Sequence, residues 1–208
     1  MIHLYYSLMK GSEQSEWFDY YYSKLNAHYK NKIKSLLRWQ DRQVSLLAIF
    51  LLIEKVCNGD WTYLNHIQYN TFGKPFIKGI PFFNISHTQD LAVVLTSESA
   101  EIGIDVELIQ NIDISEFRNV LNEEEYKNVE SDALLFFDYW TKKEAVLKAK
   151  GVGMTIDLAK VNVTRDSCIV EGVEFFMKNV YIRKEYCCWI AQQLKQIQYI
   201  KVEEIFLR

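Results

Sequence analysis

The chain has 208 residues, of which 49% are hydrophobic and 25% are charged, and its formal net charge is -3. This length allows one large domain or two of about a hundred residues each, with ample apolar material for a core. The slightly negative charge argues against a nucleic-acid binder that works through a general basic surface. No apolar run approaches the ~20 residues of a membrane helix, and the four cysteines lack metal-ligand spacing. We therefore expect a cytoplasmic protein with reduced, buried thiols and no membrane or nucleic-acid partner.

The first half of the chain is predicted to begin with a strand over 2–8 and a polar, aromatic-rich helical region over 15–37. The basic residues of that region are most simply a solvated face. A second helix is predicted over 41–57, because its apolar residues fill more than one face and Asn58-Gly59 is a stop signal. This second helix is expected to be a core element.

A turn follows at 72–75, where the sequence reads FGKP. Its glycine permits close approach of the backbone, and its proline fixes the exit of the chain. Taken alone, this is a tight turn with an exposed lysine. The segments 82–85 and 91–96 predict a hairpin, with Ser86 and His87 at the end of its first strand.

Two carboxylates stand in the strand predicted over 102–108. Ile104 and Val106 alternate with Asp105 and Glu107, and the period of two puts both carboxylates on one face, about 7 Å apart along the strand. Such a pair suits a cation. It is equally compatible with an edge strand that has a solvated face.

A helix predicted over 131–150 adds a third carboxylate. Trp140, Glu144 and Lys148 recur every four residues, so they lie on one helix face with Glu144 and Lys148 close enough to interact. In isolation this pair would be an ordinary surface ion pair. Together with the two strand carboxylates it suits Mg²⁺, which takes oxygen ligands, keeps several waters and often binds substrate phosphates.

The remaining segments complete an α+β pattern. The apolar residues of 112–121 form a short amphipathic segment, and Asn122 with Glu125 has the spacing of a capping box, which explains the acidic run 123–125. Gly151-Val152-Gly153 should end the helix. The segments 161–163, 169–177, 180–183, 187–191 and 199–205 alternate strongly and predict a strand meander.

Four blocks carry a resemblance to a known family. GKP at 73–75, NISH at 84–87, GIDVE at 103–107 and WxxKEAxxK at 140–148 stand in this order. In order and spacing the chain resembles the phosphopantetheinyl transferases of the two-subdomain kind, which modify carrier domains of peptide and polyketide synthases. The resemblance covers most of the chain from about Asp41 onward.

The resemblance implies a fold and its division. The fold would be a pseudo-dimer of two similar α/β subdomains, each a small, mostly antiparallel sheet packed with a long helix, with the active site in the cleft between them. Residues 1–100 would bind the phosphates and adenine of coenzyme A. Residues 101–208 would carry the Mg²⁺-binding strand and helix and dock the carrier protein. The chain is expected to be a monomer.

The resemblance also implies roles for individual residues. The metal ligands would be Asp105, Glu107 and Glu144; the catalytic residues Glu144, Lys148 and His87; and the coenzyme A contacts Gly73, Lys74, Ser86, His87 and Lys148, with Ser45, Lys30 and Lys32 as further candidates. Lys142, in the same block, is expected to matter less. The family usually has an arginine where this chain has Val44, which leaves open which basic residues hold the 3′-phosphate.

The implied reaction transfers 4′-phosphopantetheine from coenzyme A to a serine of an acyl or peptidyl carrier domain, releases 3′,5′-ADP and depends on Mg²⁺. The base could be Glu144 or a metal-bound water. A Mg²⁺-dependent nucleotide pyrophosphatase and a non-catalytic coenzyme A binding module are the alternatives. The carrier is expected to dock beside Ile112, Ile114 and Phe117, unless these side chains simply cover the core.

Overall fold

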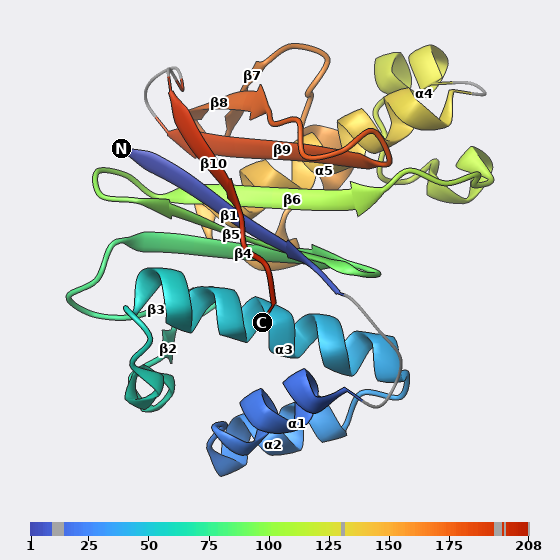
Figure 1. The fold of residues 1–208 in the computed structure, drawn as a ribbon. Helices are drawn as coiled ribbons and strands as arrows, with labels where there is room; N and C mark the ends of the chain where they lie inside the picture. Colours follow the sequence, from blue (N-terminus) through green and yellow to red (C-terminus); the bar gives the residue numbers. More distant parts are fainter. Residues whose placement is uncertain (10–14, 130–131, 194–196, 198, 208) are drawn as a thin grey trace.

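The computed structural model describes residues 1–9, 15–129, 132–193, 197 and 199–207. These residues form two four-stranded sheets, a two-stranded hairpin and two long helices, α3 (Trp39–Val56) and α5 (Ala133–Lys150). Figure 1 shows α3 below the sheets and α5 behind β6 and β9. The predicted α+β class is confirmed. No helix in these ranges is both long and apolar enough to cross a membrane.

The first sheet has the strand order β10-β1-β5-β4. Its strands are β1 (Ile2–Leu8), β4 (Phe82–Thr88), β5 (Leu91–Ser97) and β10 (Ile200–Glu204). β5 pairs antiparallel with both β1 and β4, whereas β10 pairs parallel with β1. The helices α1 (Glu16–Ser23) and α2 (Ala27–Lys34) pack on α3, on the side away from this sheet (Figure 1).

The second sheet has the order β6-β9-β8-β7 and is antiparallel throughout. Its strands are β6 (Ile102–Leu108), β7 (Ser167–Val170), β8 (Val173–Asn179) and β9 (Tyr186–Gln193). The hairpin of β2 (Gln68–Tyr69) and β3 (Pro75–Phe76), the helix α4 (Glu123–Val129) and short 3-10 turns at Trp61–Asn65, Ile114–Phe117, Gly153–Thr155 and Leu158–Lys160 complete the described elements.

The two halves share a connectivity. In the first, β1 leads through α3 to the hairpin β4–β5, and the sheet order is 1-5-4. In the second, β6 leads through α5 to the hairpin β8–β9, and the order is 6-9-8. In both cases the first strand pairs antiparallel with the last strand of the hairpin.

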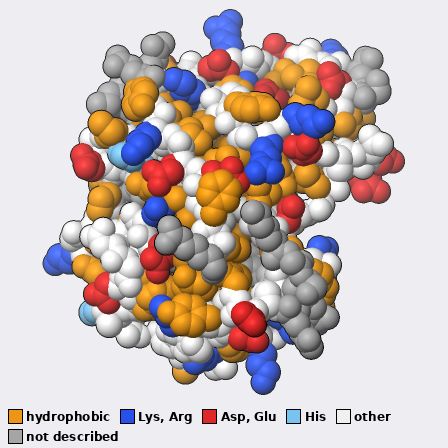
Figure 2. Space-filling view, viewed as in Figure 1, with side chains coloured by type: hydrophobic (Ala, Val, Ile, Leu, Met, Phe, Trp, Pro, Cys, Tyr) orange, Lys and Arg blue, Asp and Glu red, His pale blue; other side chains and the backbone are white. Residues whose placement is uncertain are grey.

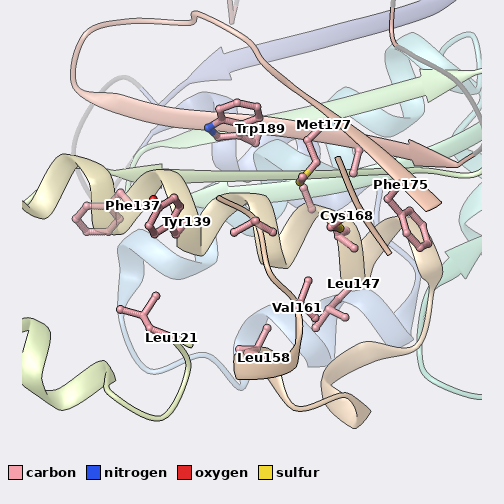
Figure 3. Packing of buried hydrophobic residues seen from close by; sticks show 14 of the residues in the cluster. Leu121, Phe137, Tyr139, Leu147, Leu158, Val161, Cys168, Phe175, Met177 and Trp189 are labelled. Carbon is pink, nitrogen blue, oxygen red and sulfur yellow. The ribbon is translucent and has the colours of Figure 1, made fainter. Parts of the chain in front are cut away.

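Three apolar clusters hold these layers together. One lies between α3 and the first sheet, one lies between the two sheets, and one lies between α5 and the second sheet. Figure 3 shows part of the last cluster, in which Phe137 and Leu147 of α5 belong to the same core as Phe175 and Trp189 of the sheet. Because α5 packs on this sheet, its residues that face β6 are held at a fixed distance from that strand.

The edge strands β4 and β6 meet without backbone pairing. Side chains of Asn84, Ser86 and Thr88 accept hydrogen bonds, at 2.8, 3.4 and 3.4 Å, from the backbone N–H groups of the residues twenty positions later in β6. These three bonds satisfy donors that β9, on the other edge of β6, does not reach. We call this row of bonds the β4–β6 ladder. It runs parallel and fixes the relative register of the two sheets.

Several sequence-based predictions for the strands and loops need correction. The segments 161–163 and 180–183 are irregular, and the segment 199–205 contains β10, which joins the first sheet and not a meander. The helical region predicted over 15–37 is confirmed and consists of two short helices, α1 and α2. Ser131, the predicted start of the long helix, lies outside the described residues. The proposed boundary between 1–100 and 101–208 stays a prediction, and β10 returns across it.

The surface and the thiols agree with the composition. Figure 2 shows side chains of both charge signs interspersed on the face that it displays. All four cysteines are free and buried.

Two of the side chains expected beside the carrier contribute to the core. Ile114 is buried, and Phe117 packs on Phe136 with ring centroids 4.9 Å apart.

A buried ion pair joins α5 to α4 and the loop after α5. The ammonium group of Lys143 lies 2.7 Å from Glu125, and both side chains are fully buried. Lys143 also donates to the carbonyl groups of Leu158 and Val161, at 2.8 and 2.5 Å, and Glu125 accepts from the N–H of Val163 at 2.9 Å. Glu125 and Asn122 also form the predicted capping box, with two reciprocal bonds of 2.9 Å.

We predict that Lys143→Met destabilises the protein by about 3–5 kcal/mol, because it leaves the Glu125 carboxylate buried without its partner. Lys201→Met, which removes a surface pair with Glu203 in which both side chains are exposed, should cost less than about 1 kcal/mol. Urea unfolding followed by circular dichroism measures both. Equal losses in the two variants would contradict a special role for the buried pair.

Gly103 sets the distance between α5 and β6. A Cβ atom at this position would lie 2.0 Å from the carbonyl oxygen of Ala145 and 2.3 Å from the backbone nitrogen of Ala149. We predict that Gly103→Ala lowers stability by at least about 3 kcal/mol, since backbone atoms cannot yield as side chains do. Gly73→Ala, where the glycine has φ 88° and open space, should cost only about 1–2 kcal/mol. A melting temperature of Gly103→Ala within a degree of wild type would show that the helix can lift without cost.

A carboxylate cluster beside Lys148

The predicted faces of β6 and α5 meet. The ammonium group of Lys148 donates to Asp105 Oδ1 at 2.6 Å, and the indole N–H of Trp140 donates to Glu107 Oε1 at 3.4 Å. Glu144 lies between Trp140 and Lys148 on the helix, within electrostatic reach of Asp105 and Lys148. We call Asp105, Glu107 and Glu144 the carboxylate cluster. The periods of two and four in the sequence therefore identified side chains that lie together.

Hydroxyl groups from β4 orient two of these carboxylates. Ser86 donates to Asp105 Oδ1 at 2.9 Å and accepts from Lys148 at 3.1 Å, and Thr88 donates to Glu107 Oε2 at 3.1 Å. Both hydroxyls belong to the β4–β6 ladder, so the contact that joins the sheets also orients the site. Sequence reasoning assigned Ser86 to coenzyme A and missed Thr88. The alternation of Asn84, Ser86 and Thr88 along β4 was the available signal.

Two oxygens of the cluster are buried without a hydrogen-bond partner, namely Asp105 Oδ2 and Glu144 Oε1. Burial, and then the nearby charge of Asp105, raise the pKa values of Glu107 and Glu144 above the ordinary value for glutamate. Burying like charges without partners is unfavourable. The cluster therefore carries more negative charge than the protein itself neutralises.

These residues fit a hydrated Mg²⁺ ion better than an enclosed metal. No described group of three or more His, Cys, Asp or Glu side chains is gathered closely enough to enclose a metal. Mg²⁺, however, is usually held by one or two carboxylates and completes its coordination with water and substrate phosphate. The two unpartnered carboxylate oxygens are suitable donors for such an ion.

His87 lies on the opposite face of β4 from Ser86 and is exposed to solvent. Its surroundings nevertheless lower its pKa: desolvation by neighbouring atoms is the main cause, followed by the positive charge of Lys148, and the charges of Asp41 and Asp105 oppose this only in part. The imidazole is therefore mostly neutral at pH 7, and an approaching phosphate would favour its protonation.

A cavity of about 210 Å³ adjoins the cluster. We call it the hairpin cavity, because residues 72–75 between β2 and β3 form one wall. The second wall comes from α5 and the residues that follow it, and Asn84 and Ile85 of β4 also line the cavity. The wall from the second half consists of Glu144, Leu147, Lys148, Gly151 and Gly153. Four residues of the predicted set thus border one space, namely Gly73, Lys74, Glu144 and Lys148.

A larger cavity of about 570 Å³ lies where β1, β6 and β9 approach the start of α3. Arg38 and Gln89 line it, together with Asp90 and Tyr186, which are joined by a hydrogen bond of 2.6 Å from the phenol to the carboxylate. Leu108, the last residue of β6, also lines this cavity, whereas the three residues of the carboxylate cluster do not.

Other predicted coenzyme A contacts lie elsewhere. Lys30 and Lys32 are on α2, and Lys30 donates to the carbonyl of Ser23 at 3.0 Å. Ser45 is half-buried on α3, and Val44 is buried in the core below the first sheet. The three predicted contacts Lys30, Lys32 and Ser45 do not line the hairpin cavity, and neither does Val44, which stands where the family usually has an arginine.

Lys142 is not the solvated lysine that its place in the sequence suggests. Its side chain is buried, lies 3.0 Å from Asp138 and 3.2 Å from Asp166, and sits over the Trp189 ring at 4.1 Å from the centroid. Trp189 in turn donates to Asp138 at 2.7 Å. Substituting Lys142 would disturb the packing of α5 on β9, so it is unsuitable as a neutral control.

Comparisons with known proteins agree with the geometry. The sequence profile of the 4′-phosphopantetheinyl transferase superfamily matches residues 101–200, which include β6 and α5. The 4′-phosphopantetheinyl transferase AcpT of Salmonella typhimurium is 31% identical over 139 residues, which are 62% of this chain and 69% of that protein. The 4′-phosphopantetheinyl transferase gsp of Aneurinibacillus migulanus is 39% identical over 94 residues, 43% of this chain and 39% of that protein.

The 4′-phosphopantetheinyl transferase Sfp of Bacillus subtilis is 25% identical over 162 residues, which are 74% of this chain and 70% of that protein. The matched region thus spans well under half of gsp and about two thirds of AcpT and Sfp. The coverage of AcpT, together with the superfamily profile over the strand and helix that carry the carboxylate cluster, shows that this chain belongs to the 4′-phosphopantetheinyl transferase superfamily.

Proposed function

We propose that this protein transfers the 4′-phosphopantetheine group of coenzyme A to a serine of an acyl or peptidyl carrier domain and releases 3′,5′-ADP in a Mg²⁺-dependent reaction. The observation that carries this proposal is the carboxylate cluster, with its two unpartnered buried oxygens beside the ammonium group of Lys148. A phosphoryl donor with a bound divalent cation is the kind of ligand that such a site neutralises.

The protein groups have separate tasks in this reaction. Lys148 is held against Asp105 and Ser86, from where it can donate to a phosphate oxygen that gains charge as the bond to 3′,5′-ADP breaks. His87, once protonated by the approach of the phosphate, adds a second donor. Bound Mg²⁺ would be held by one or two carboxylates from the set Asp105, Glu107 and Glu144, with water and substrate phosphate as its other ligands, and would neutralise charge on the pyrophosphate. Positioning of the serine and the phosphorus supplies much of the remaining rate enhancement.

Glu144 is our candidate for the proton acceptor. The serine oxygen forms a bond to the phosphorus attached to pantetheine, and its proton must leave to a base. In this role Glu144 would not hold the metal ion, which would be left to Asp105 and Glu107. Glu144 Oε1 has no partner within the protein, and the raised pKa of this glutamate makes it a stronger base than a solvated carboxylate.

The wider expectations follow from the same arrangement. The shared connectivity 1-5-4 and 6-9-8 supports a pseudo-dimer of two related halves, with 1–100 and 101–208 as its units apart from β10. The hairpin cavity and the larger cavity supply space for coenzyme A on both sides of the cluster. We also propose that the protein is a cytoplasmic monomer and that the carrier docks on the half that contains α5.

The decisive experiment incubates the purified protein with coenzyme A, Mg²⁺ and an unmodified carrier domain, and weighs the carrier by mass spectrometry. We expect one phosphopantetheine on the carrier serine. Release of phosphopantetheine without a carrier would identify a pyrophosphatase, and coenzyme A binding without any product would identify a binding module.

The same assay tests the cluster. Asp105→Asn, Glu107→Gln and Glu144→Gln should each lower kcat by about 10²-fold or more, because each removes a charge that the reacting phosphates require. Glu98→Gln, at an exposed carboxylate, is the matched control and should leave kcat unchanged. A cluster variant that keeps wild-type kcat at saturating Mg²⁺ does not supply a ligand or a base.

Removing the charge of Glu144 should lower activity but raise the stability of the metal-free protein. Its raised pKa means that the folded protein favours the protonated form, so the stability that this group contributes is present below its unfolded pKa and is lost as pH rises through its folded pKa. We predict that Glu144→Gln raises the metal-free melting temperature by a few degrees at pH 8, and that this gain disappears at pH 4. Mg²⁺ should stabilise the wild type at pH 8 and the variant much less. Scanning fluorimetry of both proteins under these three conditions measures the six melting temperatures. A lower metal-free melting temperature for the variant at pH 8 would contradict the destabilising effect assigned to the Glu144 charge.

A further inference from the structure

The amino group of Lys74 is fully engaged by the protein. It forms an ion pair with Glu101 and donates to the carbonyl oxygens of Ile102 at 3.1 Å and Ala149 at 3.3 Å. An ammonium group has three protons, so each proton has an acceptor. The side chain is only 12% exposed, although the sequence alone suggested a lysine at the tip of a solvent-exposed turn.

Asn70 makes a parallel contact from the same hairpin. Its amide Nδ2 donates to the carbonyl of Gly151 at 2.7 Å. Its Oδ1 accepts from the backbone N–H groups of Phe72 and Lys74, both at 2.9 Å. The side chain therefore shapes the turn with its oxygen and holds the end of α5 with its nitrogen.

The groups that these two side chains reach are the carbonyls at the C-terminus of α5. The last carbonyls of a helix lack partners within the helix and attract positive charge. Here the N–H of Gly151 closes back on Leu147 at 2.8 Å, whereas the carbonyls of Ala149 and Gly151 accept from the hairpin. A loop of the first half thus caps the helix that carries Glu144 and Lys148.

The fit between hairpin and helix end is close. A Cβ atom on Gly151 would lie 3.1 Å from Lys74 Cδ and 3.2 Å from Asn70 Nδ2, and one on Gly153 would lie 3.3 Å from the carbonyl oxygen of Phe72. Both glycines also have positive φ angles, 73° and 58°. The chain therefore changes direction after α5 at the point where the hairpin packs against it.

We infer that Lys74 is a positioning residue: together with Asn70 it latches the β2–β3 hairpin to the end of α5 and thereby sets the width of the hairpin cavity. Its ammonium group is engaged with Glu101 and with backbone carbonyls, and it does not contact a phosphate of the ligand. The consequence for coenzyme A rests on the proposed function, whereas the latch itself does not.

The two roles for Lys74 predict opposite effects at Glu101. If Lys74 bound a phosphate, Glu101→Gln would release the ammonium group and lower the Kd for coenzyme A. If Lys74 is the latch, Glu101→Gln loosens the hairpin, and the Kd stays equal or rises. Lys74→Met, which keeps most of the side-chain stem and removes the charge, should raise the Kd about 3- to 10-fold. It should have a smaller effect on kcat, because Glu144 and Lys148 stay on an intact helix.

Hydrogen exchange provides a readout that needs no ligand. In Lys74→Met we expect the amides of 149–153 and 70–74 to exchange about tenfold faster or more, since their opening no longer breaks the latch. Glu101→Gln should give a smaller acceleration, and the double variant should match Lys74→Met, because both changes affect one interaction. Lys78→Met, at an exposed lysine in the loop after the hairpin, is the matched control and should exchange as wild type does.

Titration calorimetry with coenzyme A in the absence of carrier, and exchange followed by mass spectrometry, together decide the matter. Faster exchange in Lys74→Met with an equal or higher Kd in Glu101→Gln supports the latch. Unchanged exchange in Lys74→Met, or a lower Kd in Glu101→Gln, overturns it. If the wild type binds no coenzyme A, the proposed function fails, and the exchange comparison alone then decides whether the latch exists.

Discussion

The structure depends on the row of side-chain hydrogen bonds by which β4 holds β6. Two sheet edges meet there, and the N–H groups of residues 104, 106 and 108 in β6 would lack these acceptors without Asn84, Ser86 and Thr88. Side chains replace a backbone ladder at this junction. Because side chains form these contacts, the hydroxyl groups of Ser86 and Thr88 can also donate hydrogen bonds to Asp105 and Glu107, respectively. The same side chains of β4 therefore join the two sheets and orient the carboxylates.

The site that results is costly for the protein on its own. Three carboxylates share a region from which water is largely removed, and only Asp105 receives a close cation, from Lys148. The remaining negative charge shows itself in the raised pKa values of Glu107 and Glu144. An arrangement of this kind is stabilised by a ligand that brings positive charge. The buried pair of Glu125 and Lys143, by contrast, has no net charge. The two side chains form their other hydrogen bonds with backbone groups.

The parts of the site that follow a local period could be predicted from the sequence. The alternation in β6 and the four-residue recurrence in α5 are enough to place Asp105, Glu107 and Lys148 together. Prediction failed where the partner of a side chain lies far away in the chain. Lys74 forms a hydrogen bond with the end of α5, and Lys142 is enclosed by β9 and the loop before β7. The strand β10 pairs with β1. None of these contacts produces a periodic pattern in the sequence from which it could be predicted.

The parallel pairing of β10 with β1 also bears on the order in which the protein can be made. Among the described elements β1 is synthesised first and β10 last, and the hydrogen bond from Tyr6 to Glu204 joins residues 198 positions apart. While the chain is still emerging from the ribosome, the first sheet has β1 as an open edge, which is a template for pairing with other chains. The first sheet can therefore be completed only after β10 has been translated, and until then the edge of β1 stays open to pairing with other chains.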